Sequence, residues 1–221
     1  MTNRPDTGSE SGAPHPEADQ VDFGPRNRVA SAERKTKETE IEVTLDLDGA
    51  GKVSVDTGVG FLDHMLDHLG KHSLTDLTVS ARGDLEVDDH HTVEDVGQCI
   101  GQALAEALGD KTGIIRYGSA SVPMDEALAE VSLDLSGRPA VVYDVRFTGD
   151  KIGAFDVQLV EEFLRRLCSA AGINLHVAAP RGSNDHHIAE AIFKAFARAL
   201  RQAKSIDPDR SDEVPSTKGS L

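Results

Sequence analysis

Two H-H-x-x-E motifs are the residues of this sequence best suited to chemistry. Their imidazole and carboxylate side chains belong to His90, His91, Glu94, His186, His187 and Glu190. Imidazole and carboxylate groups together are ligands for divalent transition metals. Each motif precedes a run with the apolar spacing of an amphipathic helix. Two such motifs facing each other would form a site for two metal ions.

Helical geometry limits how each motif can bind. Glu94 lies four residues after His90 and three after His91, so it shares a helix face with both. The two adjacent histidines point about 100° apart and fit poorly on one ion. They are better suited to two ions, or to one ion and a substrate or supporting group. The alternative is two polar helix N-termini whose glutamates interact with the helix dipole, and the repetition of the motif makes this the weaker interpretation.

The charge of the chain limits its partners. The 221 residues carry 38 acidic and 23 basic side chains, a formal net charge of -15. Such a surface repels phosphate backbones, which argues against nucleic acid as a partner. Bound divalent cations would offset part of the charge. The length suits one large domain or two small fused ones.

Several negative signals favour a cytoplasmic protein. No apolar run approaches the roughly 18 residues of a membrane span, so no membrane partner is expected. The N-terminus lacks the basic and apolar regions of a signal peptide. Cys99 and Cys168 each lie within a helical pattern and are interpreted as two buried thiols.

Hydrophobic periodicity predicts alternating strands and helices after a disordered tail over residues 1–25. Alternation over 41–47, a turn at 48–51 and a strand at 52–55 together predict a hairpin. Helices are predicted over 60–71, 92–108 and 187–203, with Gly109 ending the second. Further strands are predicted over 74–81, 85–87, 117–122, 129–135 and 140–147.

The second half of the chain repeats the first. At an offset of 98 residues, 61–69 aligns with 159–167 without gaps, and 76–79 aligns with 174–177. A loop two residues shorter then leads to the second motif helix. The order helix, strand, turn, motif helix thus occurs twice, which predicts two similar half-domains packed together.

This duplication adds a pair of candidate ligands. His64 in the first half aligns with Glu162 in the second. If the halves build related metal sites, both side chains should serve as ligands. Glu162 could equally be part of a solvated helix face beside Glu161.

Several longer runs resemble the imidazoleglycerol-phosphate dehydratase family over roughly residues 27–221. They are Asp56-Thr57-Gly58 with 61–66, Asp88 to Asp95, Leu133 to Pro139, Asn184 to His187 continuing through Phe193-Lys194-Ala195, and Pro215 to Gly219. The resemblance implies an α+β fold with an internal duplication. Each half-domain would be a four-stranded sheet with two helices on one face, of the ribosomal protein S5 domain 2-like type. The domain would span 26–221, with the repeat boundary near 115–125.

The resemblance also implies a cofactor and an assembly. Each active site would hold two Mn²⁺ ions, and a homo-oligomer of 24 subunits would share its active sites between subunits. The metal ligands would be His64, His90, His91, Glu94, His186, His187 and Glu190. Position 162 is His in some members, and the Glu162 found here is an adequate hard ligand for manganese.

The resemblance assigns further residues to the substrate. Glu38 would contact it and act as acid and base. The remaining substrate-binding positions are His64, His72, Arg116, Arg138, Lys194, Ser216, Thr217 and Lys218, of which the basic residues and Ser216 would hold a phosphate. His68 and His176 match no ligand position and are interpreted as structural.

The implied activity is that of a hydro-lyase of histidine biosynthesis. It would dehydrate the small-molecule phosphate imidazole glycerol phosphate to imidazole acetol phosphate. Two alternatives remain open: a different two-metal enzyme such as a hydrolase, and a non-enzymatic metal-binding protein. A hydrolase need not have the basic set, and a metal-binding protein leaves Glu38 without a role.

Overall fold

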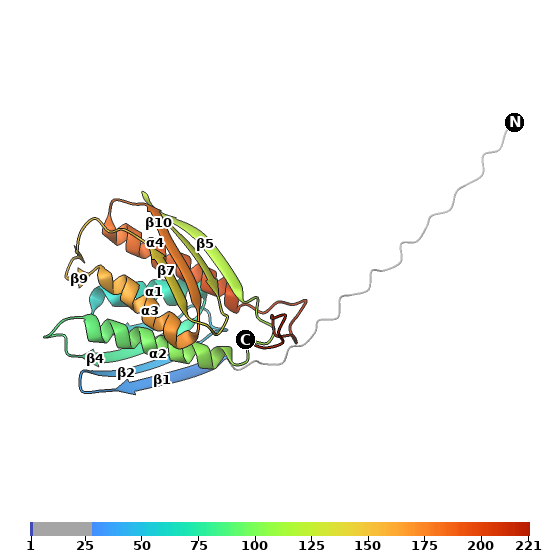
Figure 1. Ribbon diagram of the computed structural model, residues 1–221, viewed down its shortest axis with the longest axis horizontal. Coiled ribbons are helices and arrows are strands. Elements are labelled where there is room, and N and C mark those ends of the chain that lie inside the picture. The colour runs from blue at the N-terminus through green and yellow to red at the C-terminus, as the bar shows by residue number, and fades with distance from the viewer. Residues whose placement is uncertain (2–27) are drawn as a thin grey trace.

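Within residues 28–221, four helices lie between two outer β-sheets in this computed structural model (Figure 1). The structure describes Met1 and residues 28–221. The predicted disordered tail therefore lies outside the described residues, apart from Met1. Helices in the middle and sheets outside place all four amphipathic helix faces in one shared interior.

The first half-domain begins with a hairpin and ends with the first motif helix. Its elements are β1 (Val29–Lys35), β2 (Thr39–Asp46), β3 (Val53–Asp56), α1 (Gly60–Ser73), β4 (Asp76–Gly83) and α2 (His90–Leu108). The sheet order is β1-β2-β4-β3, with β3 parallel to β4 and the other pairs antiparallel.

The second half-domain repeats this topology. Its elements are β5 (Tyr117–Met124), β6 (Ala127–Asp134), β7 (Ala140–Asp144), β8 (Lys151–Ile152), β9 (Phe155–Asp156), α3 (Gln158–Ala171), β10 (Asn174–Arg181) and α4 (Asp185–Lys204). The sheet order β5-β6-β10-β7 again pairs the last two strands in parallel. The predicted duplicated α+β fold is confirmed, and α1 and β4 lie at the predicted 98-residue offset from α3 and β10.

Two local predictions are wrong, and one small hairpin was missed. Strands β2 and β3 do not form a hairpin, because β4 lies between them and pairs with both. The true hairpin joins β1 to β2. Residues 85–87 form a turn, and the small β8–β9 hairpin was not predicted. Short apolar runs show which residues are extended but not which strand they pair with.

Each sheet buries one face against its own helices. Burial alternates along β2 and along β6, so every second side chain enters the core. Both cysteines are free and buried, as predicted. Within the described part of the chain, no helix is long and apolar enough to cross a membrane.

The helices pair across the two halves, with α2 packed on α3 and α4 packed on α1. Two glycines allow α2 to approach α3 closely. A Cβ at Gly97 would lie 2.8 Å from the Phe163 carbonyl oxygen, and one at Gly101 would lie 2.4 Å from that of Leu167. This cross-pairing sets each H-H-x-x-E motif beside the first helix of the other half.

Candidate metal centre and phosphate cavity

The second motif forms a histidine-rich cluster around Glu190. His64 Nε2 and His186 Nε2 lie 2.9 and 3.0 Å from Glu190 Oε1. His68 Nε2 lies 3.6 Å from the same oxygen. Lys194 Nζ donates to Glu190 Oε2 at 2.6 Å. The side chains come from α1 and α4, so the cross-pairing of helices builds this group.

The electrostatics of this cluster keep the carboxylate ionised and one imidazole neutral. Burial would raise the pKa of Glu190, but hydrogen bonds from Lys194, His64 and His186 outweigh it and lower that pKa well below the usual range. Burial, reinforced by Lys194, lowers the pKa of His68. His68 Nε2 is buried, and among the described residues it has no hydrogen-bond partner. A neutral imidazole with an unpartnered ring nitrogen beside an ionised carboxylate fits a divalent cation.

The first motif forms a carboxylate-rich cluster with α3. One ligand atom from each of His90, Glu94 and Glu162 lies within 4.8 Å of the other two. His90 Nε2 is 3.3 Å from Glu94 Oε2. Arg166 pairs with Glu94 and donates from Nε to Glu162 Oε1 at 3.0 Å. The structure thus brings Glu162 beside the first motif, and its role as a ligand remains a prediction.

The two clusters correspond position by position. Glu162 stands where His64 stands, and Arg166 stands where His68 stands, both at the 98-residue offset. His90 and Glu94 correspond to His186 and Glu190. The histidine-rich cluster therefore contains three imidazoles and one carboxylate, and the carboxylate-rich cluster one imidazole and two carboxylates.

The two histidines of each motif have different hydrogen-bond or ion-pair partners, and their rings are nearly perpendicular. The His90 and His91 rings are inclined by 88°, and the His186 and His187 rings by 89°. His91 Nδ1 lies 3.1 Å from an Asp84 carboxylate oxygen, a hydrogen bond that raises the pKa of His91. This pairing leaves Nε2 of His91 as the nitrogen available for an ion.

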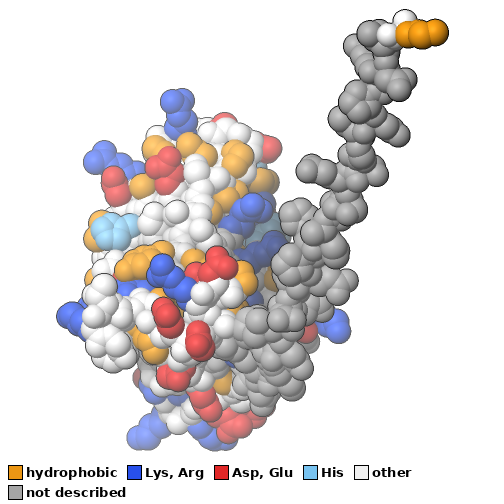
Figure 2. Space-filling view, turned by 90° about the vertical axis from the view of Figure 1, so that its right-hand side faces the viewer, with side chains coloured by type: hydrophobic (Ala, Val, Ile, Leu, Met, Phe, Trp, Pro, Cys, Tyr) orange, Lys and Arg blue, Asp and Glu red, His pale blue; other side chains and the backbone are white. Residues whose placement is uncertain are grey.

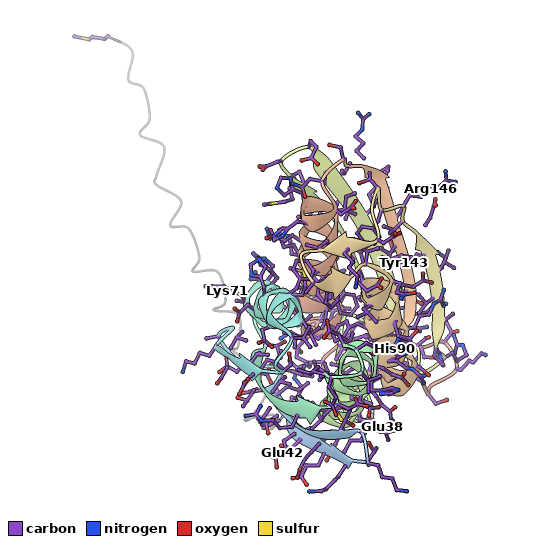
Figure 3. All side chains as sticks on the ribbon, turned by 90° about the vertical axis from the view of Figure 1, so that its left-hand side faces the viewer. Glu38, Glu42, Lys71, His90, Tyr143 and Arg146 are labelled. Atoms are coloured by element: carbon purple, nitrogen blue, oxygen red, sulfur yellow. The ribbon has the colours of Figure 1, made fainter. Side chains whose placement is uncertain are left out.

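Glu38 lies in the β1–β2 turn, which is anchored to the first motif helix. The Thr36 hydroxyl accepts from the backbone N–H groups of Glu38 and Thr39 at 3.0 Å each. The buried Thr39 hydroxyl donates to Asp95 Oδ2 at 2.6 Å. Figure 3 shows Glu38 on the same side of the molecule as His90. The Glu38 carboxylate makes no hydrogen bond or ion pair with another described residue, and its charge contributes to the raised pKa of His91.

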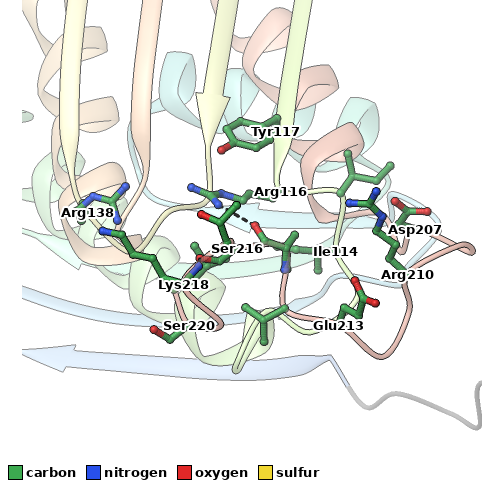
Figure 4. Close-up of a pocket in the computed structure, with 15 residues that line it drawn as sticks. Ile114, Arg116, Tyr117, Arg138, Asp207, Arg210, Glu213, Ser216, Lys218 and Ser220 are labelled. Atoms are coloured by element: carbon green, nitrogen blue, oxygen red, sulfur yellow. Dashed lines mark hydrogen bonds between the residues drawn. The ribbon is translucent and has the colours of Figure 1, made fainter.

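A cavity of about 590 Å³ lies at the other end of the helices, beside the C-terminal segment. Its lining includes five of the predicted substrate-binding residues: Arg116, Arg138, Ser216, Thr217 and Lys218. Figure 4 shows Arg138 and Lys218 together on one side of it. In Figure 2, which faces this end of the molecule, Lys and Arg side chains gather near the middle of the surface.

Two predicted phosphate ligands have other partners. Arg116 donates from Nε and Nη2 to Asp134 at 2.7 and 3.0 Å, and from Nη1 to the Pro215 carbonyl at 2.7 Å. Its guanidinium therefore holds the C-terminal segment in place. Lys194 lies in the histidine-rich cluster and does not line the cavity. His72 stacks on His68 one turn along α1, with ring centroids 5.6 Å apart.

Sequence reasoning missed three members of the site. His68 was interpreted as structural, although its position four residues after His64 places both on one helix face. Arg166 occupies the same position of the repeat in α3. Glu126, in the β5–β6 turn, accepts a hydrogen bond from His187 Nδ1 at 2.7 Å. His176, also interpreted as structural, lies exposed on β10.

The fold and these clusters define a duplicated α+β protein with paired histidine–carboxylate groups that suit divalent metal ions. The sequence profile of the imidazoleglycerol-phosphate dehydratase family matches residues 57–200. The chain belongs to this family.

Close relatives and solved structures agree with this assignment. The enzymes named imidazoleglycerol-phosphate dehydratase from Dinoroseobacter shibae and Roseobacter denitrificans are each 58% identical over 194 residues, which is 88% of this chain and all of each relative. The crystal structure of the Staphylococcus aureus dehydratase matches with a TM-score of 0.74 and 41% identity, covering 81% of this chain and 99% of that one. That of the Pyrococcus furiosus enzyme matches with a TM-score of 0.74 and 38% identity, covering 86% and 99%.

Proposed function

We propose that this chain is a hydro-lyase that dehydrates imidazole glycerol phosphate to imidazole acetol phosphate in histidine biosynthesis. Membership of the family supports the reaction. The observation that carries the proposal is the convergence of His64 and His186 on the buried Glu190. Two imidazole nitrogens at 2.9 and 3.0 Å from one carboxylate oxygen form with it a donor set that suits a divalent metal ion.

Manganese is the proposed cofactor, with two ions per active site. His64, His186 and Glu190 would contribute to one ion, and His90, Glu94 and Glu162 to another. His91 and His187 would complete the coordination with Nε2, because their Nδ1 atoms face carboxylates. When bound, Mn²⁺ supplies Lewis-acid stabilisation of negative charge on the imidazole ring of the substrate.

Glu38 is the proposed proton-transfer group. The carbon that loses its proton in this reaction is not beside a carbonyl, so a base must be positioned accurately. The hydrogen bonds of Thr36 and Thr39 fix the turn that carries Glu38 against α2. Its carboxylate stays unpaired among the described residues and available for the substrate.

Arg138 and Lys218 are the proposed phosphate ligands, with Ser216 beside them. A guanidinium and an ammonium on one side of a cavity suit a phosphate dianion. The bond from Arg116 to the Pro215 carbonyl places Ser216 and Lys218 at that cavity. Arg116 would thus act on the phosphate through the tail it anchors.

One chain does not hold a complete active site under this proposal. Fourteen residues of α4 separate Glu190 from Lys204, about 21 Å at 1.5 Å per residue. The cavity lies beyond that helix end, where the Arg116 N–H donates to the Ala203 carbonyl. A substrate of one ring, three carbons and one phosphate is shorter than this span. The metal groups of one copy would therefore meet the proposed phosphate cavity of another. The homo-oligomer of 24 subunits that the family resemblance implies would bring such copies together.

Mixing two inactive variants tests the shared site. Glu190→Gln damages a metal cluster, and Arg138→Ala damages the phosphate cavity. After dissociation and reassembly of an equal mixture, roughly a quarter of the sites would hold both intact groups if each site combines two copies. Activity should therefore return. Mixtures that stay inactive would contradict sharing between subunits.

A chelator tests the cofactor. Turnover of imidazole glycerol phosphate should disappear on chelation and return with Mn²⁺, and metal affinity should fall as pH drops through the histidine range. Full activity in a metal-free sample would contradict the metal role.

A cytoplasmic location is also proposed, supported by two buried cysteines that stay free.

A further inference from the structure

The two hairpin turns of the halves are equivalent. In β1–β2, Arg34 pairs with Ile41, and in β5–β6, Val122 pairs with Ala129, a constant offset of 88 residues. Both hairpins therefore close over the same number of residues. Glu126 occupies in the second half the position that Glu38 occupies in the first.

The two equivalent glutamates differ in their contacts. Glu126 Oε1 accepts from the backbone N–H groups of Ser183 and Asn184 at 3.0 and 2.8 Å, and from the Ser183 hydroxyl at 3.4 Å. Glu126 Oε2 accepts from His187 Nδ1 at 2.7 Å. The Glu38 carboxylate has no such partner among the described residues. One glutamate is fixed beside a motif histidine, and the other is left unpaired.

The residue that directly follows β4 or β10 explains why the two glutamates differ in their contacts. In the first half, the carboxylate beside His91 is Asp84, directly after β4. The equivalent residue after β10 is Gly182, which offers no side chain. The second motif thus has no strand-end carboxylate, and the hairpin glutamate takes its place. The presence of Asp84 in the first half leaves Glu38 unpaired.

The hydrogen bond to Glu126 selects one tautomer of His187. Nδ1 donates to Glu126, and Nε2 lies 3.5 Å from the Asn184 side-chain amide nitrogen, a donor. The Asp125 carboxylate is 3.8 Å from the same Nε2, beyond hydrogen-bond distance. A histidine that donates from Nδ1 presents an unprotonated Nε2, the form that binds metal.

We propose that Glu126 is a positioning residue that fixes the tautomer and the ring orientation of His187 for metal binding. This inference rests on the proposed function, because it requires that His187 contact an ion. It assigns the two hairpin glutamates different tasks, with Glu38 transferring a proton and Glu126 orienting a ligand.

Glu126→Gln separates orientation from loop anchoring. The amide oxygen can still accept from Ser183 and Asn184, whereas the amide nitrogen cannot accept from His187 Nδ1. Binding of Mn²⁺ to the full-length protein, followed by electron paramagnetic resonance of the free ion, should show one class of ion weakened about 10- to 100-fold. Glu130→Gln, an exposed carboxylate on β6, is the matched control and should bind as the unmodified chain does.

A double-mutant cycle shows whether the effect passes through His187. In a His187→Ala background, Glu126→Gln should change Mn²⁺ affinity by less than about twofold. If Glu126→Gln does not fold, Glu126→Asp moves the carboxylate away from His187 and should weaken the same ion several-fold. Unchanged Mn²⁺ affinity in the folded variant, or an equal loss without His187, would overturn the positioning role. An unmodified chain that binds no Mn²⁺ would instead overturn the proposed function itself.

Discussion

The histidine-rich and carboxylate-rich clusters occupy equivalent positions yet carry different donors. Around Glu190 the neighbours on the partner helix are His64 and His68. Around Glu94 the same positions hold Glu162 and Arg166. The backbone that brings the groups together is the same in both halves, while the donors it carries differ.

This difference predicts unequal ion binding. Carboxylate oxygens suit hard ions such as Mn²⁺ and Mg²⁺, and imidazoles suit softer transition ions. In the carboxylate-rich cluster Arg166 also competes directly for both carboxylates. In the histidine-rich cluster Lys194 holds Glu190 Oε2, while Oε1 faces the imidazoles. The carboxylate-rich cluster should therefore be the more selective for hard ions. Its affinity for an ion should also depend more strongly on the neighbouring cation, Arg166.

The largest expected effect concerns the hairpin glutamate of the first half. Glu38→Gln keeps the shape of the side chain and removes its basicity, so turnover should fall roughly 100-fold or more. Mn²⁺ content should stay unchanged, because Glu38 is not a proposed ligand. Glu42→Gln, an exposed carboxylate on β2, is the control. Steady-state turnover near the control value would show that the unpaired glutamate is not the proton-transfer group.

The next largest effect is expected from substitutions of Glu162, one of which gives the carboxylate-rich cluster a donor of the histidine-rich cluster. Glu162→His restores the donor type of His64 and should keep both ions and activity within a few-fold. Glu162→Ala should weaken one ion selectively, by about 10-fold or more. Metal analysis after dialysis against graded free Mn²⁺ measures both changes. Two silent substitutions would mean that Glu162 is only a partner of Arg166.

A smaller effect is expected from Arg166, the cation that pairs with both carboxylates of the carboxylate-rich cluster. Arg166→Gln removes the charge that Mn²⁺ must displace, so the affinity of the carboxylate-rich cluster should rise by about three- to tenfold. Arg165→Gln provides the matched control, because Arg165 is the sequence neighbour of Arg166 and pairs with Glu161. Calorimetric titration distinguishes the two variants. Weaker binding in Arg166→Gln would indicate that the arginine supports the ion site.

The last effect is on stability and lies at the junction of the halves, away from both clusters. The buried Lys204 of α4 donates to the carbonyls of Leu47 and Leu74 in the first half. Burial lowers its pKa from 10.5 to about 8. Between these pH values the unfolded chain binds more protons, so Lys204 should add stability as pH rises, by at most about 1.4 kcal/mol per unit. Lys204→Met should abolish this slope in urea unfolding, and an unchanged slope would assign it to other groups.

The repeat could be predicted from the sequence because its signals lie within short stretches of the chain. Helix periodicity and the 98-residue offset identified α1, α3, β4 and β10, and cross-pairing of helices then explains why His64 and Glu162 approach the motifs. Strand partners were harder to predict, since β3 pairs with a strand beyond α1 and not with its neighbour β2. The parallel crossover leaves no turn signal between partners.

Side-chain partners of the site were the least predictable. Glu126 was missed because its contact to His187 depends on a hairpin 61 residues away. Its relation to Glu38 emerges only from the strand register. Lys194 was assigned to phosphate, and in this structure its partner is Glu190.

The central claim is that two equivalent clusters each hold one divalent ion. Counting Mn²⁺ bound per chain in the unmodified protein, in Glu190→Gln and in Glu94→Gln tests it most directly. The clusters predict two ions per unmodified chain and the loss of one ion, a different one, in each variant. Loss of the same ion in both variants, or of neither, would contradict the account.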